Sequence, residues 1–160
     1  MKTLVNWLNW SSSSFEGAKK ENKPVILNLT AVWCHWCHVN DKENYNDKDI
    51  ADYINKYFIP IRVDIDKRPD IKERYHFGGF PSTVFLNNKA EIIQGYTYLP
   101  RNYLKLVLKD IKENFNSKKP ILSQAKEYGK CLSKIDKPII DEVLGYLINN
   151  FDESFGGFGL

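Results

Sequence analysis

The stretch VILNLTAVWCHWCHV, residues 25–39, joins an apolar run to two cysteines, Cys34 and Cys37. The run over residues 25–30 is rich in β-forming side chains and predicts a short buried strand. The cysteines follow it directly, and the next segment, CHVNDKENYN (residues 37–46), is predicted to be helix interior. A Cys-x-x-Cys pair can be a redox dithiol, half of a zinc site or a haem anchor. The surrounding chain has to distinguish these three.

The composition limits the classes of protein to which this chain can belong. The chain has 160 residues, 42% of them hydrophobic and 14% aromatic, which suits one ordinary domain with a real core and perhaps an appendage. Its 23 basic and 20 acidic residues are mixed along the chain, and a net charge of +3 is too weak to indicate nucleic-acid binding. No run approaches a membrane span.

Cysteine usage indicates the compartment. There are three cysteines, two of them in one motif, whereas a disulfide-stapled secreted scaffold has more and scatters them. The first twenty residues contain no long apolar segment of the kind that a signal peptide needs. With Met1 as the natural start, a cytoplasmic location is expected. Close cysteine pairs in a reducing cytosol are more often catalytic or metal-binding than structural.

The rest of the chain predicts helices and strands in alternation. Ser13 and Glu16 form a capping-box pattern at the start of a helix that Pro24 ends. The further elements expected are a second amphipathic helix capped at residues 46–47, a strand over 59–65, a short helix opened by Pro69, strands over 82–86 and 91–96 around a turn at 87–88, and a long helix opened by Pro100. Strands separated by helices predict parallel pairing, and the last two strands predict a hairpin. The fold class is therefore α/β, with a central mixed β-sheet flanked by helices.

The position of the cysteine pair favours redox chemistry. Cys34 is expected where a buried strand ends and a helix begins, where free backbone N–H groups and the helix dipole stabilise a thiolate. Cys34 is therefore predicted to be the exposed attacking thiol, and Cys37 the more buried resolving thiol. His35, as a cation, would stabilise the Cys34 thiolate further. Trp33 and Trp36 are predicted to flank the sulfurs and limit solvent access.

A second feature supports this prediction independently. Pro81 follows Gly78, Gly79 and Phe80 and directly precedes a predicted strand. Proline in that position is a good candidate for a cis peptide bond. Such a loop, facing the cysteines, would present the backbone of Phe80 to an extended substrate, which could pair with it as an added strand. Phe80 and Pro81 are thus candidate substrate-binding residues, together with Trp33 and Trp36.

Four stretches, CHWCHV, VDIDKRPDI, GGFPSTVFL and the late FDESFGGFG, resemble the thioredoxin-like domain of the spermatogenesis-associated protein 20 family, within the thioredoxin superfamily. The resemblance covers roughly residues 7–98 and touches the C-terminus again. It implies a thioredoxin-like domain over 1–116 and a helical extension over 117–160. In that family a large α/α-barrel domain follows. The chain therefore resembles either a family member cut at the domain border or a stand-alone version.

Two positions depart from the patterns that the resemblance implies. Thioredoxins carry a buried Asp, thought to relay a proton to the resolving cysteine, where this chain has Asn28. An amide cannot titrate, which puts fast thioredoxin-style reduction in doubt. The family motif usually continues with Met where this chain has Asn40, which we interpret as a change in packing.

Other interpretations of the cysteine motif remain open at this stage. Cys34, Cys37 and His38 also fit the haem-attachment pattern, with His76 as a conceivable second axial ligand. Zinc could use both cysteines and one of the three histidines, although no second ligand pair exists at a distance. In a third alternative, the domain is a non-catalytic thioredoxin-like interaction module that serves a helical partner domain. His38 is interpreted as a structural hydrogen-bonding residue rather than a proton shuttle.

The sequence favours a thiol–disulfide oxidoreductase with catalytic residues Cys34, Cys37 and His35. The expected partners are a disulfide-containing protein or a small thiol, and an external thiol reductant or oxidant; no cofactor or metal is predicted. Cys131 is expected to be an unpaired thiol. After residue 136 a second strong helix is predicted. Its apolar stripe, expected to be covered by this domain, a dimer mate or a helical partner domain, contains Ile140, Val143, Leu144 and Leu147.

Overall fold

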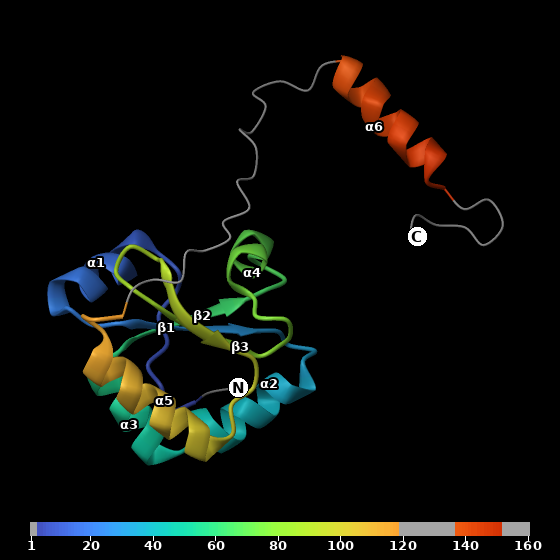
Figure 1. The fold of residues 1–160 in the computed structure, drawn as a ribbon. Coiled ribbons are helices and arrows are strands. Elements are labelled where there is room, and N and C mark those ends of the chain that lie inside the picture. The colour runs from blue at the N-terminus through green and yellow to red at the C-terminus, as the bar shows by residue number, and fades with distance from the viewer. Residues whose placement is uncertain (1–2, 119–136, 152–160) are drawn as a thin grey trace. The chain divides into compact units, whose positions relative to one another are not determined.

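The structure is a computed structural model that describes residues 3–118 and 137–151. The chain divides into two compact units, residues 1–125 and 126–160. The first contains every described strand, and the second contains one described helix (Figure 1). Cys131 lies outside the described residues, so the prediction that it is unpaired stays a prediction.

The first unit alternates helices with strands, as the sequence predicts. Its elements in chain order are α1 (Ser12–Glu21), β1 (Val25–Thr30), α2 (His35–Asn40), the π-helical turn η1 (Asp41–Tyr45), α3 (Lys48–Tyr57), β2 (Ile59–Asp64), α4 (Pro69–Tyr75), β3 (Ser82–Leu86), β4 (Ile92–Tyr96) and α5 (Arg101–Asn114). None of the helices within residues 3–118 and 137–151 combines the length and the apolar character needed to cross a membrane.

The four strands form one mixed sheet in the order β2-β1-β3-β4. The predicted parallel pairing of β1 with β2 and the β3–β4 hairpin are confirmed. The prediction of parallel pairing is wrong for β3, which runs antiparallel to β1. Helix α4 has seven residues and rises only about 10 Å, less than the length of a strand. The chain therefore stays at the end of the sheet where β1 and β2 finish. Strand β3 starts there, with Ser82 opposite Leu29.

Helices cover both faces of the sheet (Figure 1). Helices α1 and α4 lie on one face, and α2, η1, α3 and α5 lie on the other. The first face buries a cluster that includes Leu27 and Leu29 of β1 and both motif cysteines. The second buries Ile26, Phe85 and the apolar sides of α3 and α5. The predicted α/β class, with helices flanking a mixed sheet, is confirmed.

The N-terminal segment lies along the outer edge of β2. The backbone N–H of Leu8 donates to the Pro60 carbonyl at 2.8 Å, and the N–H of Arg62 donates to the Leu8 carbonyl at 3.0 Å. These bonds make Leu8 and Ile61 an isolated parallel bridge. Part of the β2 edge is thereby paired.

Two local predictions need correction. Ser11, not Ser13, caps α1, because its side chain accepts the Ser14 N–H at 3.3 Å. The predicted helix over residues 37–46 is α-helical only to Asn40. It then widens into η1, where the Asn46 N–H donates to the Asp41 carbonyl at 2.9 Å, five residues back. The predicted cap at Asp47 is confirmed.

The second unit contains the predicted C-terminal helix, α6 (Lys137–Asn149). The side chains of its predicted apolar stripe are exposed, namely those of Ile140, Val143, Leu144 and Leu147. The proposed dimer mate or helical partner domain for this stripe stays a prediction.

The absence of a side chain at Gly95 on β4 makes room for the ring of Phe77. A Cβ added at Gly95 would overlap the ring of Phe77 at Cε2. We expect Gly95→Ala to lower the free energy of unfolding by about 1–3 kcal/mol, because a packed ring has to move. Gly17 inside α1 is the matched control, since an added Cβ there meets nothing within 4 Å. Gly17→Ala should stabilise by about 0.5–1 kcal/mol. Equal urea midpoints for the two variants would contradict the packing argument.

Asp47 connects the start of α3 to α5. Its carboxylate accepts the Ile50 N–H at 3.0 Å and pairs with Arg101 at 3.5 Å and Lys105 at 3.7 Å. The Ile50 hydrogen bond, followed by these two cations, holds the pKa of the carboxyl below its usual value.

Asp47→Ala should therefore cost about 1 kcal/mol of unfolding free energy at pH 7. A depressed folded-state pKa stabilises the protein above the unfolded pKa, and this contribution is lost as the pH falls through the folded value. The difference from wild type should accordingly shrink below about pH 4. Urea titrations at several pH values measure it, with Asp47→Asn as the uncharged capping control. A difference that persists unchanged at low pH would contradict a role for the ionised carboxylate.

Candidate functional site

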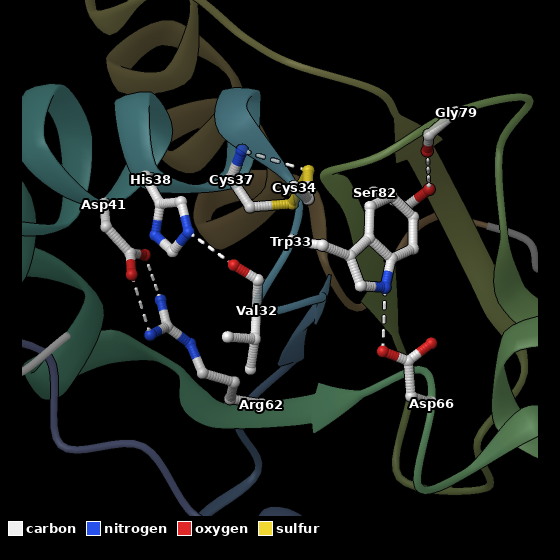
Figure 2. Close-up of a disulfide and its surroundings, with 10 residues drawn as sticks. All are labelled: Val32, Trp33, Cys34, Cys37, His38, Asp41, Arg62, Asp66, Gly79 and Ser82. Atoms are coloured by element: carbon white, nitrogen blue, oxygen red, sulfur yellow. Dashed lines mark hydrogen bonds and ion pairs between the residues drawn. A yellow bond between two sulfur atoms is a disulfide. The ribbon is translucent and has the colours of Figure 1, made fainter.

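The two motif cysteines form a disulfide at the start of α2 (Figure 2). Their Cα atoms are 5.2 Å apart. Cys34 is the N-cap residue of the helix, and its Sγ accepts the backbone N–H of Cys37 at 3.2 Å. The Cys37 N–H also donates to the Cys34 carbonyl at 3.1 Å, so the sulfur shares this donor at the positive end of the helix dipoles, an environment that stabilises a thiolate.

The predicted exposure of Cys34 is wrong for this oxidised state. Cys34 is 6% exposed and Cys37 is 2% exposed, so both are buried. They belong to the core cluster between the sheet and helices α1 and α4, and Phe80 packs against that cluster. Cys34 is slightly more exposed than Cys37, in the order that the predicted roles require, but the difference in exposure is small.

The two tryptophans of the motif lie on the surface. Trp33 is 66% exposed and Trp36 is 56% exposed. Trp33 Nε1 donates to the Asp66 carboxylate at 2.8 Å, so its ring is directed toward the loop after β2 (Figure 2). The Trp36 ring packs against Tyr98, with centroids 5.4 Å apart. Both rings thus have partners outside the motif, and the prediction that they limit solvent access to the sulfurs stays a prediction. Sequence reasoning did not identify Asp66 or Tyr98, because both are distant in the chain.

The two motif histidines differ in surroundings. His35 is exposed, and its ring meets the edge of Trp36 at 5.9 Å between centroids. His38 Nε2 lies 2.7 Å from the Val32 carbonyl (Figure 2). Since a carbonyl can only accept, this nitrogen donates. His38 thereby ties α2 to the loop that precedes Cys34, consistent with the predicted structural hydrogen bond.

The loop that contains Phe80 and Pro81 lies at the same end of the sheet as the cysteines. The peptide bond between these residues is cis, and Gly78 has a φ of 79°. Ser82 fixes the loop, because its hydroxyl donates to the Gly79 carbonyl at 2.7 Å and accepts the Phe77 N–H at 3.1 Å. Phe80 is half-buried against the cysteine cluster.

A buried ion pair lies behind the motif. Arg62 of β2 donates to both carboxylate oxygens of Asp41, at the start of η1 (Figure 2). The Arg62 guanidinium also lies over the Trp7 ring at 4.6 Å from its centroid. Asn28 is 1% exposed, and its side-chain amide faces Arg62. The orientation that satisfies the donors places the amide oxygen toward the guanidinium, 3.2 Å from Nε and 3.0 Å from Nη2. The position where thioredoxins have a carboxyl is therefore part of a hydrogen-bonded polar group.

The alternative of a zinc site needs a cluster of metal ligands. Nowhere in residues 3–118 and 137–151 do three His, Cys, Asp or Glu side chains gather closely enough to hold a metal ion. His76, one of the three histidines considered as a ligand, is exposed at the end of α4. The zinc alternative therefore finds no ligand set in these ranges.

Known proteins resemble this chain over different lengths. Human spermatogenesis-associated protein 20 is 28% identical over 182 residues, covering 96% of this chain and 23% of that protein. Thiol:disulfide interchange protein DsbD of Campylobacter jejuni (strain RM1221) is 31% identical over 87 residues, covering 49% of this chain and 15% of that protein. The chain spans about a quarter or less of the length of these curated relatives.

Solved structures and a family model complete the comparison. The structure described as DsbH oxidoreductase matches with a TM-score of 0.60 at 20% identity, covering 68% of this chain and 85% of that one. This match shows a thioredoxin-like fold. The family model described as Thioredox_DsbH, protein of unknown function, DUF255, matches residues 1–133. The chain therefore belongs to the Thioredox_DsbH (DUF255) family.

Proposed function

We propose that this protein is a thiol–disulfide oxidoreductase that uses Cys34 and Cys37 as its redox pair. The observation that carries the proposal is the disulfide at the start of α2, with the Cys34 sulfur accepting a helix N–H. The thioredoxin-like fold and the similarity to a thiol:disulfide interchange protein support this class of chemistry. The substrate is a disulfide-containing protein or a small thiol.

The chemistry proceeds through a mixed disulfide. In the reducing direction, the Cys34 thiolate attacks a substrate disulfide, forms an S–S bond to one substrate sulfur and releases the other, which takes a proton. Cys37 then loses its proton and attacks Cys34 Sγ. The substrate sulfur leaves as a second thiol, and the enzyme is left with its own disulfide. An external thiol reductant restores the dithiol; an external oxidant drives the same steps in reverse.

Other residues have supporting roles in this proposal. His35 is exposed beside Cys34 and, as a cation, would stabilise the thiolate. Trp33 and Trp36 provide apolar surface for the substrate, and the Phe80–Pro81 loop offers backbone for an extended chain. The cytoplasmic location predicted from cysteine usage is part of the same proposal.

The rival proposal is a non-catalytic interaction module. Exposed Trp33 and Trp36 would suit a binding surface equally well. The formed disulfide, capped by a helix N–H, favours the enzyme, because a binding surface needs neither feature.

A redox titration tests the proposal. The full chain is equilibrated across a glutathione series, its free thiols are alkylated, and the modified cysteines are counted by intact mass. We expect a reversible two-electron transition between roughly −270 and −120 mV. Cys34→Ser is the matched control and should show no transition. A wild-type protein without a transition in that range would favour the interaction module.

A further inference from the structure

The helix behind the disulfide buries a polar face. Cys37, Asn40, Asp41 and Asn44 follow one another at the spacing of a single helix side, across α2 and η1. Asn40 is 2% exposed, Asp41 is 4% exposed and Asn44 is fully buried. The buried side of a helix is ordinarily apolar, because buried polar groups are costly unless they are hydrogen-bonded. Each of these groups therefore needs a partner.

Most of these buried polar groups have a hydrogen-bond partner. Arg62 binds both oxygens of Asp41. The Asn44 Nδ2 group donates to Asn40 Oδ1 at 2.6 Å and to the Leu99 carbonyl at 2.8 Å. The Tyr45 hydroxyl lies 3.3 Å from Thr83 Oγ1.

Two atoms remain. Asn40 Nδ2 and Asn44 Oδ1 are buried and make no hydrogen bond of ordinary length to the described residues, although the Asn40 amide lies close enough to the Tyr45 hydroxyl to lower its pKa. One is a donor and the other an acceptor, and they belong to amides already joined by a hydrogen bond. A buried water could accept a hydrogen bond from the free donor and donate one to the free acceptor, which lie on adjacent side chains.

The site lies on the same buried side of the helix as the resolving cysteine. Side chains three apart on a helix have Cβ atoms about 5–6 Å apart, so Asn40 is a direct neighbour of Cys37. One water can bridge that separation with hydrogen bonds of ordinary length. A thiolate in apolar surroundings is disfavoured, whereas hydrogen-bond donors stabilise it.

We propose that Asn40 and Asn44 hold a buried water beside Cys37, and that this water stabilises the Cys37 thiolate in the resolving step. The inference rests on the proposed function. Both asparagines are positioning residues, because they act through the water on the reacting sulfur.

The step balances without any further reactant. In the mixed disulfide, the S–H bond of Cys37 breaks and its proton passes through the water to the leaving substrate sulfur. The Cys37 thiolate forms the bond to Cys34 Sγ while the bond from Cys34 to the substrate sulfur breaks. The substrate sulfur leaves with that electron pair and, with the relayed proton, becomes a thiol. The cysteines are oxidised and the substrate sulfur is reduced.

Titratable and charged groups from the surrounding elements also affect this sulfur. On its own helix and η1 they are His35, His38, Asp41 and Tyr45; from β2 and α4 they are Arg62 and Tyr75. The positive charge of Arg62 offsets the negative charge of Asp41, to which it is hydrogen-bonded. Burial raises the pKa of Tyr45, against the opposing effect of Thr83 and the nearby Asn40 amide, and burial also raises that of Tyr75. Both phenols are therefore neutral near pH 7.

One assay separates this inference from the proposed function. The reduced full-length protein reacts with the aromatic disulfide dithiobis(nitrobenzoate). Attack by Cys34 releases one coloured thiol, and resolution by Cys37 releases the second. Stopped-flow absorbance across pH then gives one profile for each cysteine. If neither phase is seen, the proposed function fails; if the first phase is normal, the second tests the inference.

We expect Asn40→Leu, which has nearly the same shape, to slow the second phase at pH 7 about tenfold and to move its pH midpoint upward. The first phase should be unchanged. Thr83→Val is the matched control: it removes a buried hydroxyl from the same cluster but leaves both asparagines, so its second phase should match wild type.

Two results would overturn the inference. The first is a second-phase pH midpoint that is the same in Asn40→Leu and wild type, or equally shifted in Thr83→Val. The second needs no variant: a high-resolution crystal structure of the wild-type chain whose density has no water within hydrogen-bond distance of Asn40 Nδ2 and Asn44 Oδ1. If Asn40→Leu does not fold, this structure decides the question.

Discussion

Replacing Cys37 with serine will trap the substrate on Cys34. The Cys34 sulfur would still accept the helix N–H of residue 37 and still attack a disulfide, but no second thiol could resolve the product. We expect a mixed disulfide that survives non-reducing electrophoresis and disappears with dithiothreitol. Turnover of a disulfide substrate, such as reduction of insulin, should fall by roughly two orders of magnitude or more.

Cys34→Ser is the matched control. It should lose turnover equally and trap nothing, because the proposal assigns the attack to Cys34, the sulfur that accepts a backbone N–H at the helix start. An interaction module would behave differently, since both serine variants would keep the same partner without a covalent bond. Equal trapping by the two variants would contradict the assignment of Cys34 as the attacking thiol.

Removal of Arg62 should produce the largest loss of stability. Its side chain is 18% exposed and that of Asp41 is 6% exposed, so the pair is largely shielded from water. Arg62→Met would leave a buried carboxylate without its cation and would also remove the partner of Asn28. We expect a loss of about 3–5 kcal/mol in unfolding free energy, measured by urea denaturation.

The double variant Arg62→Met, Asp41→Leu separates charge from packing. It should recover most of the loss, because neither charge then remains buried alone. Arg68→Met is the surface control, since Arg68 pairs with Asp70 in an exposed position, and its denaturation midpoint should match wild type. If Arg62→Met and Arg68→Met denatured alike, the buried pair would have no special contribution.

Local sequence signals predicted most of the fold. The strand over residues 82–86 and the helix opened by Pro69 were predicted correctly, because turn residues and apolar runs mark them within a few positions. The direction of β3 was not predicted correctly, because it depends on whether α4 is long enough to return the chain across the sheet. The start of α1 was misplaced for a simpler reason: four consecutive serines offer several equivalent caps.

The site was only partly predictable. The sequence placed Cys34 and Cys37 at a strand–helix junction, which the structure confirms. It did not predict that Arg62 would pair with Asp41, or that Asn44 would bind the Leu99 carbonyl, because residues 21 and 55 positions apart meet only through the fold. The π-helical turn was likewise not predicted, because its residues suit an α-helix.

The pairing of Leu8 with β2 has a consequence for how the protein avoids self-association. An outer strand presents unpaired N–H and C=O groups to any other extended chain, and proteins that leave such edges open tend to aggregate. Here the N-terminal segment occupies part of that edge. Loss of the first ten residues would uncover it and also remove the Trp7 ring from Arg62. Such a shortened chain should associate edge to edge as its concentration rises, which light scattering would detect.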